Sequence, residues 1–134
     1  MTMKKKTVLK SDLGEVKTQF FTFGDKQNPF VFRTGEKLQQ VTLAYETYGT
    51  LSPARDNAIL VFHALSGNQH AAGLNRSVRG VGSLWTDELH LGWWDNFIGP
   101  GKAFDTNTYF VICANYVGGC YGSSGPVTRN PATG

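Results

Sequence analysis

The sequence lacks the features that mark secreted, membrane-bound and disulfide-rich proteins. Its 134 residues hold only two cysteines, Cys113 and Cys120, which are too few for a disulfide framework. No apolar run approaches the ~18 residues that a membrane-spanning helix needs, and residues 1–10 carry positive charge without the apolar core of a secretory signal. We therefore expect reduced thiols, a cytoplasmic location and no membrane partner.

Signatures of nucleic-acid, phosphate and metal binding are missing as well. The net charge is only +3, and much of the excess lies in a lysine run without interleaved aromatic residues, so we expect no nucleic-acid partner. Residues 99–102 (GPGK) lack the first glycine and the hydroxyl residue of a phosphate-binding loop. His70 and His90 lack the paired spacing of a metal site. We expect neither a metal nor a bound cofactor.

Glycine is abundant, with 16 residues among short β-branched and aromatic runs. This composition indicates strands joined by tight loops rather than a helical bundle. Residues 18–23 and 30–33 are short strand candidates. Residues 38–48 alternate most clearly between two faces, with Val41, Leu43 and Tyr45 on one and Thr42, Ala44 and Glu46 on the other.

Two later runs, residues 57–62 and 109–114, are rich in apolar residues, which is typical of parallel strands buried on both faces. The chain between them is long enough for a crossover connection. Part of it, residues 74–91, lacks clean periodicity and is expected to run over the surface. Residues 117–134 indicate a long loop. We therefore predict an α/β fold in which antiparallel meander strands lead into a parallel sheet.

Long amphipathic helices, which an α/β sheet needs to cover its faces, are almost absent. An uncovered sheet would expose apolar side chains, so we expect the chain to be the N-terminal part of a larger domain. Residues 1–16 are predicted to form a flexible leader, and residues 17–134 the N-terminal part of that domain.

The most informative segment is the apolar strand that ends in the glycine-terminated loop of residues 63–67 (HALSG). Small residues there let a substrate approach the main chain, and backbone amides can stabilise the oxyanion of acyl transfer. A plain turn at the end of a strand explains the same spacing equally well. His63 is either a catalytic base or, as its apolar neighbours favour, a structural histidine bonded to the backbone.

A second candidate nucleophile is Cys120, which lies in a glycine-rich segment after the strand of residues 109–114. Paired with His63 or His70, its thiolate would make a cysteine hydrolase. No third group that would orient the histidine is evident. An incidental thiol in a glycine-rich loop is therefore the favoured interpretation.

Four segments together resemble the homoserine O-acetyltransferases: residues 43–49 (LAYETYG), 63–67 (HALSG), 92–106 (GWWDNFIGPGKAFDT) and 118–126 (GGCYGSSGP). The resemblance runs from about residue 38 to the end and implies the N-terminal part of an α/β-hydrolase fold. It implies acetyl transfer from acetyl-CoA, a substrate rather than a bound cofactor, to the hydroxyl of L-homoserine in methionine biosynthesis. It also implies a homodimer for the full-length enzyme.

In that family the reaction passes through an acyl-serine, with a histidine as general base and an aspartate that orients it. No Gly-x-Ser-x-Gly turn occurs in this sequence, so we expect the chain to end before the nucleophile elbow, and none of the three catalytic residues can be placed on it. The one catalytic element that carries over is the first oxyanion-hole donor, which falls on the backbone N–H of Leu65. The 134-residue chain alone is predicted to be inactive.

Two alternatives are left open. One keeps the fold and changes the donor or acceptor, as in a homoserine O-succinyltransferase or a serine O-acetyltransferase. The other is a non-enzymatic fragment or standalone module. We expect such a module to fold poorly alone, because its sheet edges and apolar faces would be uncovered.

Overall fold

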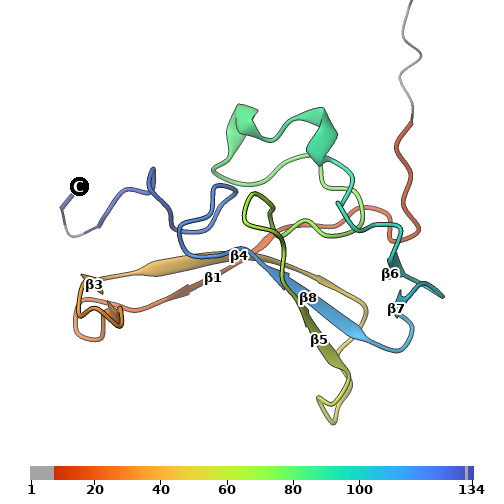
Figure 1. Ribbon diagram of the computed structural model, residues 1–134, viewed down its shortest axis with the longest axis horizontal. Helices are drawn as coiled ribbons and strands as arrows, with labels where there is room; N and C mark the ends of the chain where they lie inside the picture. The colour runs from red at the N-terminus through yellow and green to blue at the C-terminus, as the bar shows by residue number, and fades with distance from the viewer. Residues whose placement is uncertain (1–7, 132) are drawn as a thin grey trace, which may run out of the picture.

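The structure is a computed structural model that describes residues 8–131 and 133–134. Its largest element is a four-stranded sheet with the order β1-β4-β8-β5 (Figure 1). The strands are β1 (Gln19–Phe23), β4 (Val41–Tyr48), β5 (Ala58–Val61) and β8 (Phe110–Ala114). β4 pairs antiparallel with β1 and β8, and β8 pairs parallel with β5. Antiparallel strands thus lead into a parallel pair, as predicted.

Shorter elements complete the fold. β2 (Phe30–Val31) and β3 (Lys37–Leu38) form a hairpin, β6 (Ile98–Gly99) pairs in parallel with β7 (Phe104–Asp105), and the 3-10 helices are η1 (Gly82–Leu84) and η2 (Asp87–Leu89). The strand predicted over residues 30–33 is shorter than expected. The one predicted over residues 38–48 is broken, because the chain bends at residues 39–40 between the hairpin and β4. None of the described residues forms an α-helix, and no helix among them is long and apolar enough to cross a membrane.

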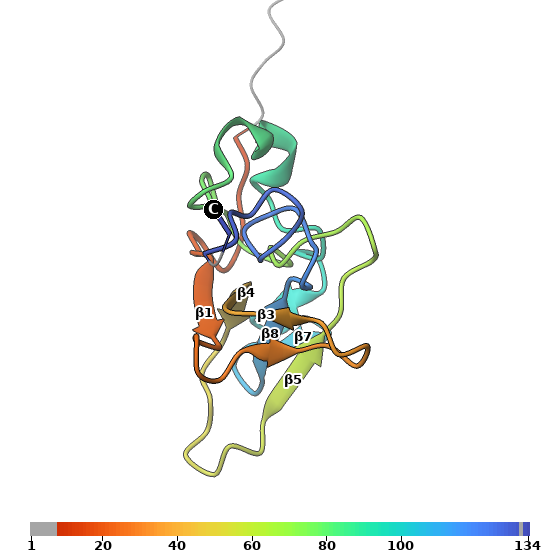
Figure 2. The ribbon, with the colours of Figure 1, turned by 90° about the vertical axis from the view of Figure 1, so that its left-hand side faces the viewer.

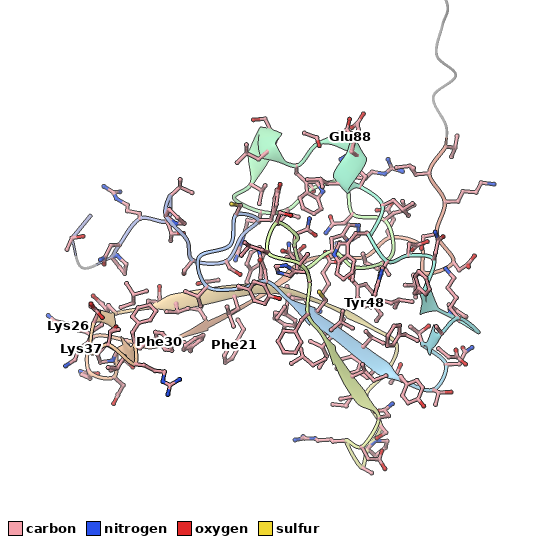
Figure 3. All side chains as sticks on the ribbon, in the orientation of Figure 1. Phe21, Lys26, Phe30, Lys37, Tyr48 and Glu88 are labelled. Carbon is pink, nitrogen blue, oxygen red and sulfur yellow. The ribbon has the colours of Figure 1, made fainter. Side chains whose placement is uncertain are left out.

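The irregular segments gather over one face of the main sheet (Figures 1 and 2). That face presents alternate residues of β4 and β8, and most of these are buried: Ala44, Glu46, Tyr48, Val111 and Cys113. The opposite face is less covered, although Val41 on it is fully buried. Phe21 extends from it (Figure 3) and is 58% exposed, and Leu60 and Phe62 are 53% and 70% exposed.

The prediction that residues 57–62 are buried on both faces is wrong for this chain. β5 lies at the edge of the sheet, next to β8 alone. Among the described residues, no segment covers the outer side of Leu60 and Phe62. An apolar strand is buried on both faces only where other elements pack against both, and here only one face is packed.

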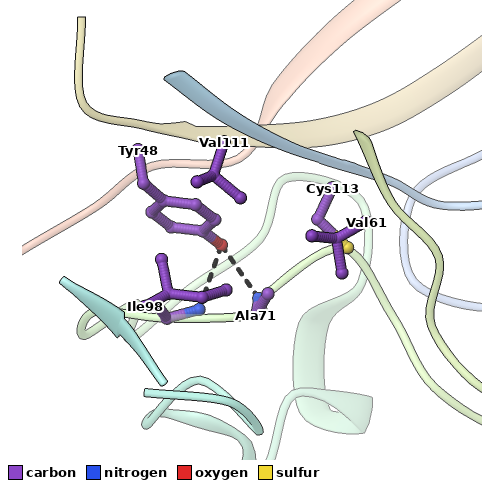
Figure 4. Packing of buried hydrophobic residues seen from close by; sticks show 7 residues of the cluster. Tyr48, Val61, Ala71, Ile98, Val111 and Cys113 are labelled. Atoms are coloured by element: carbon purple, nitrogen blue, oxygen red, sulfur yellow. Dashed lines mark hydrogen bonds between the residues drawn. The ribbon is translucent and has the colours of Figure 1, made fainter. Parts of the chain in front are cut away.

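The covered face carries two buried apolar clusters. The first joins β4, β5 and β8 to the segments above them, through Tyr48, Val61, Ala71, Ala72, Ile98, Val111 and Cys113 (Figure 4). The second consists of Val78, Val81 and Trp85. Residues 74–91 are irregular, as predicted. Because the second cluster lies within them, the inner side of this segment is buried rather than lying on the surface.

Part of the predicted leader contacts the core. Residues 1–7 lie outside the described residues, whereas Leu13 and Val16 pack against the first cluster. The Ser11 hydroxyl also donates a hydrogen bond to Asp95 Oδ1 at 2.5 Å. The boundary at residue 16 stays a prediction.

Candidate active site

Two loops meet at one end of the parallel strand pair. Residues 63–67 follow β5, and residues 115–125 follow β8. Because β5 and β8 are parallel neighbours, their carboxyl ends lie side by side, and both loops extend over the covered face (Figure 1). In open α/β sheets, ligands bind at this end of the strands. These two loops therefore form the candidate active site.

His63 joins the two loops as a structural residue. It is 5% exposed, with Nε2 3.0 Å from Asn115 Oδ1 and Nδ1 2.7 Å from the Ala64 carbonyl oxygen. The Tyr116 ring packs against the His63 ring, with 4.1 Å between their centres, and its hydroxyl donates to the His63 carbonyl at 2.5 Å. Both ring nitrogens are engaged, so His63 is not free to act as a base. This arrangement confirms the structural interpretation that the sequence favoured.

Leu65 lies at the tip of the first loop. The Gly67 N–H donates to the Ala64 carbonyl at 2.8 Å and closes a β-turn with Leu65 and Ser66 at its centre. Within the described part of the chain, nothing accepts a hydrogen bond from the Leu65 N–H. The turn fits tightly against His63, since a Cβ on Gly67 would lie 3.0 Å from the His63 Cβ. An unused amide thus lies on an anchored turn, and its role as an oxyanion donor stays a prediction.

The second loop is tied to β4 by serine hydroxyls. Ser123 Oγ and Ser124 Oγ accept hydrogen bonds from two backbone N–H groups of β4, each at 2.9 Å. Gly119 packs so closely that a Cβ there would lie 2.4 Å from the Asn115 amide oxygen. The glycine and serine residues of this loop are therefore explained by packing and by bonds to the backbone. Residues 117–134 lack helices and strands where they are described, as predicted.

Cys120 is exposed in the second loop but has no histidine partner among the described residues. His63 is bound as above, and His70 is 1% exposed with Nδ1 2.7 Å from Glu46 Oε2. The cysteine–histidine pair considered from the sequence is therefore not formed. The other thiol, Cys113, is buried. Burial is the larger cause, and the negative charge of Glu46 the smaller, of a rise in its pKa to about 12. Cys113 is thus a neutral thiol at ordinary pH.

The GPGK segment binds a carboxylate of its own chain. Asp105 Oδ1 accepts hydrogen bonds from the Gly101 N–H at 2.8 Å and from the Asn107 N–H at 3.0 Å, and these bonds lower the pKa of Asp105. The loop amide that a phosphate would use is therefore already occupied.

Across residues 8–131 and 133–134, no group of three or more His, Cys, Asp and Glu side chains is placed to hold a metal ion.

Sequence reasoning missed a buried polar network centred on Glu46. This side chain is fully buried on the covered face of β4, and each carboxylate oxygen meets two donors. Oε1 accepts from the Thr18 hydroxyl at 2.7 Å and from Asn75 Nδ2 at 2.9 Å. Oε2 accepts from the Tyr48 hydroxyl at 2.9 Å and from His70 Nδ1 at 2.7 Å. Strand alternation could not have found it, because it places Glu46 with Thr42 and opposite the more apolar face of the strand.

Comparisons with known proteins show what this chain is similar to. No protein-family model matches the chain. The homoserine O-acetyltransferase of Deferribacter desulfuricans is 49% identical over 124 residues, which make up 92% of this chain and 30% of that protein. The chain is a homologue of the homoserine O-acetyltransferases. It spans about 30% of the length of the curated relatives that it matches.

Solved structures agree with this relationship to the homoserine O-acetyltransferases. The homoserine O-acetyltransferase from Bacillus anthracis matches with a TM-score of 0.69 and 37% identity, over 89% of this chain and 30% of that chain. Esterase E22 matches with a TM-score of 0.71 and 31% identity, over 90% of this chain and 31% of that chain. The α/β-hydrolase fold expected from the sequence is thereby confirmed.

One curated relative of similar identity has a different name. The homoserine O-succinyltransferase of Nocardioides sp. is 52% identical over 122 residues, which make up 91% of this chain and 30% of that protein. Homoserine O-acetyltransferases and a homoserine O-succinyltransferase thus match the chain almost equally well. Sequence identity over these residues therefore does not distinguish relatives named for acetyl transfer from the one named for succinyl transfer.

The segments that carry the resemblance to homoserine O-acetyltransferases are close together in the fold. Residues 43–49 include most of β4, and residues 92–106 include β6 and β7. Residues 63–67 are the loop after β5, and residues 118–126 include most of the loop after β8. Two of the four segments therefore build the candidate active site itself.

Proposed function

We propose that this chain is the part of a homoserine O-acyltransferase that supplies the first oxyanion-hole amide, the Leu65 N–H. The observation that carries the proposal is the 49% identity to a homoserine O-acetyltransferase over 92% of the chain. The unused Leu65 amide at the carboxyl ends of two parallel strands supports it, because acyl transfer requires a donor at such a position.

The proposed reaction uses acetyl-CoA and L-homoserine. A serine from outside these residues attacks the thioester, and the carbonyl oxygen becomes a tetrahedral oxyanion to which Leu65 N–H donates. Collapse releases the CoA thiol and leaves an acyl-serine, which the homoserine hydroxyl then attacks in the same way. One oxyanion donor contributes about 2.7–4 kcal/mol to such a step. The product would enter methionine biosynthesis.

A chimera tests this proposal. We would replace the matching portion of the Deferribacter desulfuricans homoserine O-acetyltransferase with this chain and follow CoA release from acetyl-CoA in the presence of L-homoserine. Transfer at a rate within about tenfold of the parent enzyme is expected, because half of the exchanged residues are identical. A folded chimera that transfers no acyl group would contradict the proposal. The isolated 134-residue chain is expected to show no turnover.

Two further measurements on the chimera separate neighbouring activities. Succinyl-CoA in place of acetyl-CoA tests the donor, which the Nocardioides relative leaves open. Esterase activity is the second candidate function, favoured by the match to esterase E22. Acyl release that is independent of homoserine would favour a hydrolase, since water would then be the acceptor.

A further inference from the structure

A buried, paired histidine, His70, follows the turn that carries Leu65 in the chain. Glu46 and His70 are 0% and 1% exposed, and His70 Nδ1 lies 2.7 Å from Glu46 Oε2. Glu46 has three further donors. The Thr18 hydroxyl and Asn75 Nδ2 both donate to Oε1, and the Tyr48 hydroxyl donates to Oε2.

The second nitrogen of His70 is held as well. Its Nε2 lies 3.1 Å from the carbonyl oxygen of His90, which can only accept a hydrogen bond. Both ring nitrogens of His70 are therefore engaged, and the ring is fixed between Glu46 and the backbone.

The other titratable groups beside Glu46 are neutral and leave this pair undisturbed. Burial, and then the charge of Glu46, raises the pKa of Tyr48 well above its ordinary value. Burial and the same charge raise the pKa of Cys113. Tyr48 and Cys113 therefore add no charge beside Glu46.

This pair holds the backbone on the C-terminal side of the turn. The Tyr48 hydroxyl donates to Glu46, and it accepts hydrogen bonds from the Ala71 and Ala72 N–H groups at 2.8 and 3.1 Å (Figure 4). Since Glu46 takes the hydroxyl proton, the oxygen lone pairs are left to face the two amides. His70 lies in the same segment, so side chain and backbone of residues 70–72 are both bound to the network.

The N-terminal side of the turn is held separately. His63 is fixed by Asn115 and Tyr116, as described above. Between these two anchors, residues 64–66 are exposed. The Leu65 amide is thus at the centre of a short span that is held at both ends, and its direction depends on both anchors.

We propose that Glu46 and His70 are positioning residues that hold the Leu65 N–H in the direction required by the oxyanion. They lie in the interior and act through residues 68–72. The proposal rests on the proposed function above. Stability alone does not account for the pair, because replacing buried ionisable partners with apolar residues is often neutral or stabilising. Fixing one conformation of the adjacent turn does account for it.

Kinetics of the chimera test the proposal. Glu46→Gln and His70→Gln are each expected to lower kcat for acetyl transfer about 10- to 100-fold, because a displacement of about 1 Å at a reacting group has such an effect. The KM for L-homoserine should change less than about threefold, since neither residue is on the surface that a substrate reaches. Glu36→Gln, the same change on the exposed β2–β3 hairpin, is the matched control and should leave both constants unchanged.

A double-substitution cycle identifies the amide as the target. In a Leu65→Pro background, which has no N–H at that position, Glu46→Gln should lower kcat by less than about threefold. An equal loss in both backgrounds would show that Glu46 acts elsewhere, and the proposal would be wrong. An effect of Glu46→Gln on KM alone, with kcat unchanged, would also show that the proposal is wrong.

A second measurement does not depend on activity. In nitrogen-15 NMR of the unsubstituted chimera, the Nδ1 signal of the His70 ring should shift when Glu46 is replaced by Gln, because Glu46 is its partner. An unchanged Nδ1 signal would overturn the pairing of Glu46 with His70 whether or not the chimera transfers acyl groups. An inactive chimera whose Nδ1 signal responds to Glu46→Gln would instead contradict the proposed function and leave the pairing in place.

Discussion

Replacing Leu65 with proline removes the backbone N–H that the proposed reaction needs and little else. The side chain is 96% exposed, so its loss leaves no cavity. No hydrogen bond from this N–H stabilises the described part of the fold, so its removal leaves no broken pair there. The substitution therefore separates a role in catalysis from a role in folding more cleanly than a change at a buried residue.

The turn geometry accommodates a proline at this position. Leu65 is the second residue of the turn that Gly67 N–H closes on the Ala64 carbonyl. Among the described residues, Arg55 is the only non-glycine residue with a positive φ, so both central residues of the turn have negative φ. That combination is typical of a type I turn, whose second position favours proline with its φ of about −65°.

The expected result is a large kinetic effect with a small effect on stability. Losing one oxyanion donor should lower kcat of the chimera about 10²- to 10³-fold, which corresponds to about 2.7–4 kcal/mol. Thermal unfolding should shift by no more than the equivalent of about 1 kcal/mol. The matched control is Leu65→Ala, which keeps the N–H and should keep kcat within about threefold because the side chain is exposed.

The refuting outcome is specific. If Leu65→Pro unfolds like the unsubstituted chimera and still transfers acetyl groups within about threefold of its rate, the Leu65 amide is not an oxyanion donor. If Leu65→Ala loses as much activity as Leu65→Pro, the side chain rather than the amide is responsible.

Three further predictions concern the core and the two thiols. Tyr48→Phe leaves two buried N–H groups without an acceptor, which costs about 1–3 kcal/mol for each. Urea unfolding of the chimera should therefore show a free energy of unfolding that is lower by about 3 kcal/mol. Tyr45→Phe on the same strand should lower it by less than about 0.5 kcal/mol. Cys120 should react with a thiol reagent at pH 8, whereas Cys113, whose pKa is raised to about 12, should react only after unfolding. The folded state favours the neutral Cys113 thiol. Its contribution to the free energy of unfolding is therefore present below pH 9 and is lost as the pH rises toward 12. Cys120→Ser should leave acyl transfer unchanged, and a loss of more than about tenfold would revive a thiol mechanism.

The strands of the main sheet could be predicted from the sequence because their pattern is local. The predicted strands at residues 18–23 and 109–114 each extend one residue beyond the N-terminal end of the observed strand, and end where it ends. Apolar runs and period-two alternation arise from the geometry of each strand itself. The shortened strand at residues 30–33 shows the limit, because pairing with β3 is what decides its length.

Burial could not be predicted in the same way. Residues 57–62 form an apolar run, yet the outer face of β5 is open because no described segment packs on it. Glu46 shows the reverse, since a charged residue on an alternating strand is expected to be exposed and is instead fully buried. Whether a side chain is buried depends on what lies opposite, which one segment of sequence does not contain.

The sequence by itself determined the strands, the loop of residues 63–67, the lack of a nucleophile turn and the resemblance to homoserine O-acetyltransferases. Only the tertiary structure decided which groups in that loop are free: His63 is engaged at both ring nitrogens, whereas the Leu65 N–H is unused. It alone revealed the pairing of Glu46 with His70, which are 24 residues apart. Strand patterns follow from local backbone geometry, whereas hydrogen bonds between distant residues exist only once the segments that carry them have packed together.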